Sequence, residues 1–141
     1  KELYDRVDDA VCAVRSALLE GILPGGGLAL YSFYKKYEEL SVSGERNSKQ
    51  IAYKILADAL RAPLSQILTN AGMSDQEIYK DIRGYTKGFD VKNRVYGDMF
   101  KMGIIDPMKV TKTALQNAVS VAITILSTNA IVTMARTYEA K

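Results

Sequence analysis

The stretch Leu23-Pro24-Gly25-Gly26-Gly27-Leu28 is the centre of the sequence pattern, because its three consecutive glycines join two strongly helical segments. Glycine loses more backbone entropy on folding than any other residue, so an ordered glycine run needs a reason. Either the backbone takes unusual dihedral angles there, or another group comes close to it. A glycine-rich turn that opens a helix can also seat an anion or a sugar phosphate on its free N–H groups. The stretch therefore predicts either a ligand site or a plain hinge.

Length and composition indicate one ordinary globular domain. The chain has 141 residues, of which 48% are hydrophobic and 25% are charged, which is typical of soluble proteins with a real core. No apolar run reaches the roughly 18 residues of a membrane span, and no signal peptide is visible. The chain begins at Lys1 rather than Met, as a fragment or a processed product does.

Charge and residue types exclude several classes of function. The net charge of +3 is small and the basic residues are scattered, which argues against a nucleic-acid-binding protein. Cys12 is the only cysteine, so no internal disulfide can form, and we expect a reducing, cytoplasmic location. The absence of histidine removes a histidine-based triad and the usual zinc sites. Any chemistry must rest on carboxylates, lysines, hydroxyls and backbone groups.

Apolar periodicity predicts a mostly α domain with one or two short strands or a hairpin. We expect helices over 2–20, 28–40, 49–60 with a kink or restart at Pro63 and continuation to Gly72, 74–82, 96–102 and 109–127. The last helix is the most apolar, and we expect it at the centre of the fold. A polar loop over 41–48, a short hairpin or ordered loop over 84–93 and a strand over 130–134 complete the prediction.

Three features have plain structural interpretations. Asp8 and Asp9 lie about 100° apart around a helix, so they are a poor acid–base pair and read as solvated charges near a helix start. Asp106-Pro107 is typical of a helix N-cap followed by proline at the first helical position. The aromatic stripe from Leu30 to Tyr37 is typical of a core face.

The same motifs occur in an order that resembles one known family. They are Arg6-Val7-Asp8-Asp9-Ala10, Glu20 to Gly27, Ala59 to Leu64, Gly88-Phe89-Asp90, Tyr96 to Met99, Gly103 to Pro107, and Lys109-Val110-Thr111. Together they resemble the C-terminal part of a group I chaperonin of the GroEL type, over residues 3–134. The resemblance implies that residues 1–20 end the intermediate domain and that 21–141 form the C-terminal half of the equatorial, ATP-binding domain.

The resemblance also implies roles for individual residues. The aspartate matching Asp9 is the catalytic carboxylate that helps to orient or activate the attacking water. The positions expected to face the ribose and the base are Gly25, Gly26, Gly27, Asp90, Val91 and Asp106. Asp106 would accept hydrogen bonds from the ribose hydroxyls, since a carboxylate is a two-oxygen acceptor that suits a diol. Asp90-Val91 stands where the common bacterial pattern has Asn-Ala.

The resemblance further implies cofactors and partners. It implies ATP and magnesium, with the phosphate loop and the magnesium-binding aspartate in an N-terminal half that nothing here matches. Unfolded substrate proteins and a co-chaperonin would bind an apical domain, and the parent would form homo-oligomeric rings, without nucleic acid or membrane. Because phosphate and metal ligands are missing, we expect no ATP turnover by this chain alone.

Two other interpretations stay open. The chain could be a helical interaction or oligomerisation module, in which the triple glycine is a hinge and Asp106 a cap. A weak nucleic-acid binder that uses the nine tyrosines is less favoured, because basic and aromatic residues are not interleaved. If the chain is alone, we expect an exposed apolar face that promotes self-association.

Overall fold

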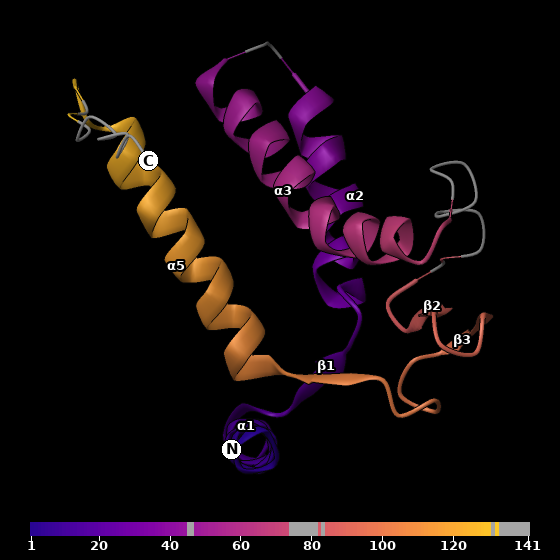
Figure 1. Ribbon diagram of the computed structural model, residues 1–141. Coiled ribbons are helices and arrows are strands. Elements are labelled where there is room, and N and C mark those ends of the chain that lie inside the picture. Colours follow the sequence, from indigo (N-terminus) through magenta and orange to yellow (C-terminus); the bar gives the residue numbers. More distant parts are fainter. Residues whose placement is uncertain (45–46, 74–81, 83, 131, 133–141) are drawn as a thin grey trace, which may run out of the picture.

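The computed structural model describes residues 1–44, 47–73, 82, 84–130 and 132. Helices dominate, and short strands pair in two antiparallel sets, which confirms the predicted mostly α class. In chain order the elements are α1 (Glu2–Glu20), β1 (Ile22–Pro24), α2 (Leu28–Val42), α3 (Ser48–Asn70), β2 (Lys87–Asp90), β3 (Val95–Asp98), β4 (Ile105–Pro107) and α5 (Met108–Leu126). Figure 1 shows α2 and α3 side by side, with α1 and α5 set apart from them.

The core lies between α2 and α3. It is formed by apolar and aromatic side chains that repeat at helical spacing on both helices, together with two from the hairpin region: Leu28, Tyr31, Tyr34, Ala57, Leu60, Leu64, Leu68, Ile82 and Met99. Tyr34 and Tyr37 of the predicted stripe face this core, whereas Phe33 is exposed. The α2 stripe is therefore rotated slightly toward Leu28 and Tyr31.

Helix α3 is longer and more continuous than the sequence predicts. It begins at Ser48, where the Asn47 side chain accepts hydrogen bonds from the backbone N–H groups of Lys49 and Gln50, as an N-cap does. Pro63 lies inside α3 without ending it, and Figure 1 shows the ribbon changing direction along its length. A proline removes one helical hydrogen bond and bends the helix. Because α2 also runs on to Val42, the expected 41–48 loop is shorter than predicted.

Strands β1 and β4 join the segment that follows α1 to the segment that leads into α5. Their antiparallel register pairs Ile22 with Pro107, Leu23 with Asp106 and Pro24 with Ile105. In Figure 1 β1 and the orange segment of β4 meet between α1 and the other helices. Neither strand is predicted by the periodicity, because a three-residue strand has too few alternating positions to be recognised.

Of the short hairpin or ordered loop expected over 84–93, the structure has a hairpin, but its second strand lies farther along the chain and replaces a predicted helix. β2 pairs with β3, Asp90 opposite Val95 and Lys87 opposite Asp98, so the helix expected over 96–102 is wrong. Only a compact turn follows β3. There the N–H of Lys101 donates to the Asp98 carboxylate at 3.1 Å and the N–H of Met102 donates to the Asp98 carbonyl at 3.0 Å. The residues that form this turn resemble the start of a helix in the sequence, although no helix forms.

The expectation that the most apolar helix lies at the centre is also wrong. None of the residues of α5 is buried, and Val121, Ile123 and Leu126 are more than half exposed. In Figure 1 α5 runs apart from α2 and α3. Apolar composition shows that a helix needs cover but does not say what covers it.

The helix expected over 74–82 and the strand expected over 130–134 lie almost entirely outside the described residues. Among the described residues, no helix is both long and apolar enough to cross a membrane.

Candidate functional site

The glycine turn packs closely against the entry of β4 and against α3. The N–H of Gly25 donates to the carbonyl of Ile104 at 2.9 Å, which ties the turn to the entry of β4. Gly26 and Gly27 have φ values of 65° and 77°, in the left-handed region that favours glycine. A Cβ on Gly27 would lie 2.8 Å from the backbone nitrogen of Leu64 in α3. The turn therefore needs glycine for dihedral angles and for close approach, as the sequence predicts.

Asp106 lies beside this turn, in β4 and opposite Leu23 of β1. It is not the N-cap of the last helix, because the cap position is Pro107 and no side chain caps α5. Among the described residues its carboxylate has neither a hydrogen-bond nor an ion-pair partner, and burial raises its pKa above the usual value. The interpretation of Asp106 as a simple cap is therefore wrong. A desolvated carboxylate without a partner is typical of a functional position.

Gly27 and Asp106 line one pocket of about 510 Å³ between α2, α3 and α5. Pro63 of α3 and Val110 and Thr111 of α5 contribute to its walls, which are mostly apolar. Asp106 therefore supplies an acceptor in an apolar hollow next to the start of α2, which has no side-chain cap. Such a hollow, with few polar groups, is typical of a small-molecule site.

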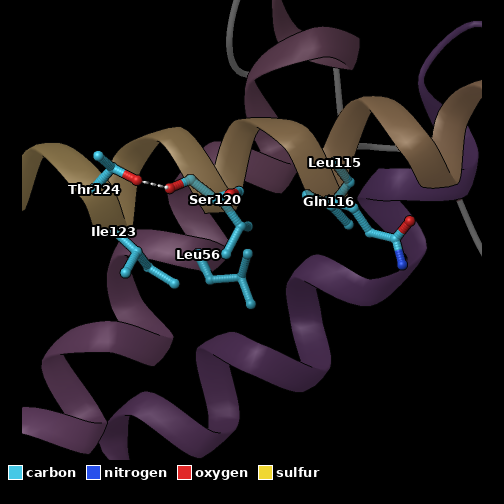
Figure 2. Close-up of a pocket in the computed structure, with 7 residues that line it drawn as sticks. Leu56, Leu115, Gln116, Ser120, Ile123 and Thr124 are labelled. Carbon is cyan, nitrogen blue, oxygen red and sulfur yellow. Dashed lines mark hydrogen bonds between the residues drawn. The ribbon is translucent and has the colours of Figure 1, made fainter.

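A second pocket, of about 540 Å³, continues along α5 from the first, and Leu115 lines both. Figure 2 shows Leu56 of α3 and Ile123 of α5 on its wall, with the Thr124 hydroxyl donating to the Ser120 carbonyl at 2.9 Å. This hydrogen bond is internal to α5, so the wall offers little polar chemistry. The second pocket is an apolar space along the exposed helix.

Replacing Asp106 with asparagine should stabilise the chain at neutral pH. The folded-state pKa of Asp106 is raised by burial, so the folded state disfavours the ionised form. The contribution of Asp106 to stability is then fully present below its unfolded-state pKa and is lost as the pH rises through its folded-state pKa. Urea unfolding of both proteins at several pH values measures this. Asp106→Asn should gain over the parent on going from pH 3 to pH 7, and a constant difference would contradict the assignment.

The hairpin turn holds Asp90 and Val91. Asp90 is buried, and its carboxylate accepts hydrogen bonds from the N–H groups of Lys92 and Asn93 and from the Asn93 side chain. Hydrogen bonds from the Asn93 side chain and then its backbone hold the pKa of Asp90 below the usual value. Val91 is 39% exposed. Neither residue lines the pocket that contains Asp106.

Met99 connects this hairpin to the glycine turn. A Cβ on Gly88 of β2 would lie 2.8 Å from the Met99 sulfur, and one on Gly26 would lie 3.3 Å from the Met99 methyl group. Met99 is buried, and its backbone joins Thr86 and Ile104 by hydrogen bonds of 2.9 Å. The side chain of Met99 thus lies between the two segments that the sequence assigns to one site.

Asp9 is not brought to this pocket. It lies on the exposed surface of α1, a helix that contacts β4 and α5. Gly21, with φ of 90°, follows α1, and Glu20 at its end forms an ion pair with Lys112 in the first turns of α5. The sequence gives no signal for this pair, because its partners are far apart in the chain. Among the described residues, no group of three cysteine or acidic side chains could hold a metal ion.

Comparisons with known proteins show the family of this chain. Residues 1–136 match the model of the TCP-1/cpn60 chaperonin family. The chain therefore belongs to that chaperonin family, as its motifs predict. It is 44% identical over 134 residues to chaperonin GroEL 3 of Psychromonas ingrahamii and 40% identical over 136 residues to chaperonin GroEL of Orientia tsutsugamushi.

The chain spans only part of these relatives. Each alignment covers 94% of this chain but 24% of the relative. The crystal structure of a group III chaperonin in the open state superposes with a TM-score of 0.71 at 29% identity, over 83% of this chain and 25% of that one. The described fold is therefore one part of a chaperonin architecture.

Proposed function

We propose that this chain forms the ribose- and base-facing wall of a chaperonin ATP site, in a protein that assists protein folding. The observation that carries the proposal is Asp106, a desolvated carboxylate that has no partner among the described residues and shares a pocket with Gly27. A two-oxygen acceptor there suits a diol such as the ribose hydroxyls. The chaperonin family of the chain supports ATP as the nucleotide.

We also propose roles for the other segments and residues. Residues 1–20 would end an intermediate domain and 21–141 would form half of an equatorial domain. Gly25, Gly26 and Gly27 let the backbone approach the nucleotide, and Val91 faces the base. Asp9 would act as the catalytic carboxylate only after α1 moves relative to the pocket, with Gly21 as the flexible point. Phosphate and magnesium ligands would come from elsewhere in the longer protein, since a bound magnesium ion supplies charge neutralisation at the phosphates.

A second role is favoured by α5. Its exposed apolar residues form a face with no cover in the described chain, and the relatives are about four times as long as this chain. We therefore propose that α5 packs against the rest of the same chaperonin, which would assemble into rings in the cytoplasm. Substrate proteins and a co-chaperonin would bind parts of the protein beyond these residues.

Calorimetric titration of the purified chain with ATP and Mg²⁺ tests the proposed ribose- and base-facing wall. We expect micromolar binding that Asp106→Ala weakens by about tenfold or more, because a hydrogen bond to a charged group is worth roughly 1.5–3 kcal/mol. Asp58→Ala is the matched control, since Asp58 pairs with Lys54 on the surface of α3.

Two results would contradict this proposal. Equal affinities of the parent and Asp106→Ala would remove Asp106 from the site. Absence of ATP binding by the parent would mean that these residues do not form a working wall on their own.

A further inference from the structure

Met99 follows β3 and has both of its backbone groups fixed. Its N–H donates to the carbonyl of Thr86, and its carbonyl accepts from the N–H of Ile104, each at 2.9 Å. The second of these bonds spans a turn that ends at Gly103, which has φ of 72°, and the N–H of Gly103 donates to the carbonyl of Phe100 at 3.2 Å. The bonds to Met99 and Phe100 follow the pattern of a Schellman motif, which closes a helical turn. The backbone of Met99 is therefore held in place ahead of β4.

The same turn is tied to the glycine stretch through Ile104. The carbonyl of Ile104 accepts from the N–H of Gly25 at 2.9 Å, so this residue joins Met99 on one side and Gly25 on the other. A Cβ on Gly25 would lie 3.1 Å from the carbonyl carbon of Ile104, so the two backbones are in close contact. Asp106 lies two residues after Ile104, in β4. A shift of Met99 would therefore reach both the glycine stretch and Asp106.

The side chain of Met99 packs directly against the glycine stretch. Met99 is only 2% exposed. Apart from the chain neighbours of Gly26, the methyl group of Met99 is the only heavy atom of the described residues within 4 Å of the position of a Cβ on Gly26, at 3.3 Å. The Met99 sulfur would lie 2.8 Å from a Cβ on Gly88, so the side chain also lies close against the backbone of β2. Methionine is ordinarily adaptable, but here it is confined, and it supports Gly26 from one side.

We propose that Met99 is a positioning residue of the nucleotide site. Its methyl group supports Gly26, and its carbonyl, through Ile104, sets the distance between the glycine stretch and Asp106. This inference rests on the proposed ATP site. Gly26 has φ of 65° and no side chain that could hold it in place, and a wall that must become ordered on binding loses affinity. Met99 does not line the pocket that contains Asp106, so it acts through its neighbours and not as a ligand.

Two matched exchanges separate this role from general core packing. Met99→Leu keeps an apolar side chain of similar volume, a change that cores tolerate well, but leucine is shorter and does not reach Gly26. Leu68→Met makes the reverse exchange in the same core. Leu68 of α3 is fully buried, and none of its atoms lies within 4 Å of the Cβ position of Gly26. Urea unfolding should therefore show small and similar changes in midpoint for both variants.

Relaxation of ¹⁵N nuclei in the ligand-free chain and titration with Mg·ATP together test the proposal. In the parent and in Leu68→Met the backbone order parameters of Gly25 and Gly26 should be near the rigid value of about 0.85, and in Met99→Leu they should fall below about 0.7. We expect Met99→Leu to weaken Mg·ATP binding by about three- to tenfold, and Leu68→Met to weaken it by less than about twofold.

Three results would overturn the proposal. Order parameters that do not change in Met99→Leu would show that Met99 does not hold the glycine stretch. A loosened stretch that binds Mg·ATP as tightly as the parent would show that its position does not matter. Equal loosening in Leu68→Met would show a general effect of core packing. Failure of the parent to bind Mg·ATP would instead defeat the proposed ATP site, and loosening confined to Met99→Leu would still show that Met99 holds the stretch.

Discussion

Gly27→Ala should lower the free energy of unfolding by about 2–5 kcal/mol. Gly27 has φ of 77°, and a left-handed conformation costs a residue with a side chain roughly 1–2 kcal/mol. The added Cβ would also lie 2.8 Å from the Leu64 nitrogen and 3.1 Å from the Leu64 Cα. Both atoms belong to the backbone of α3, which cannot move without disturbing the core, and overpacking of this kind costs about 1–3 kcal/mol.

Gly103→Ala is the control that separates the two effects. Gly103 has a similar φ of 72°, but no atom lies within 4 Å of the position of its Cβ. Gly103→Ala should therefore cost only the conformational part, about 1–2 kcal/mol. Urea unfolding followed by circular dichroism measures both. If Gly27→Ala is no less stable than Gly103→Ala, then α3 shifts to make room for the added Cβ, and the close approach of Gly27 to α3 is not essential.

This result bears on how the glycine stretch is interpreted. Gly27 lines the pocket with Asp106, so a loss of nucleotide binding in Gly27→Ala could arise from unfolding alone. Gly26 is the better residue for a binding test, because Gly26→Ala would carry only the conformational cost of its φ of 65° and a contact of its Cβ with the flexible methyl group of Met99, at 3.3 Å. The two interpretations of the stretch, ligand site and structural turn, are therefore not exclusive. The middle glycine is packed only against a side chain, and the last one is packed against the backbone of α3.

The sequence predicts those secondary-structure elements that local patterns of residues determine. α1 and α3 carry apolar stripes and α1 ends at a glycine, so their positions follow from periodicity alone. The pairing of β1 with β4 joins Leu23 to Asp106, and no local pattern reports a contact between residues so far apart. For that reason Asp106-Pro107 looks like a helix cap in sequence, although Asp106 is a strand residue facing a pocket.

The candidate site is predictable to a similar extent. The resemblance of the motifs selects Gly25–Gly27 and Asp106, and the fold brings them together. It also selects Asp90, whose carboxylate the fold instead engages with Asn93. An Asp-x-x-Asn spacing between two short strands could have indicated this turn in advance. Only the resemblance assigns Asp9 to the candidate site. No local pattern reports the distance between Asp9 and the pocket, because that distance depends on how α1 is oriented.

Leu68→Ala should cost about 2–5 kcal/mol, whereas Ile123→Ala should change the stability of this chain by less than about 0.5 kcal/mol. Leu68 of α3 is fully buried in the core, while Ile123 of α5 is 60% exposed. Removal of a buried side chain loses apolar burial and leaves a cavity, and neither occurs at an exposed position. Urea unfolding of the two variants beside the parent measures the difference.

The same pair of variants tests the proposal that α5 packs against the rest of a longer chaperonin. Placed in a full-length chaperonin, of which this chain is about a quarter, Ile123→Ala should become costly, because the rest of the protein would then cover α5. A cost that is near zero in both settings would contradict the proposal that α5 packs against the remainder of the protein. A large cost already in the short chain would mean that copies of the chain cover α5 themselves, and sedimentation would then detect self-association that depends on concentration.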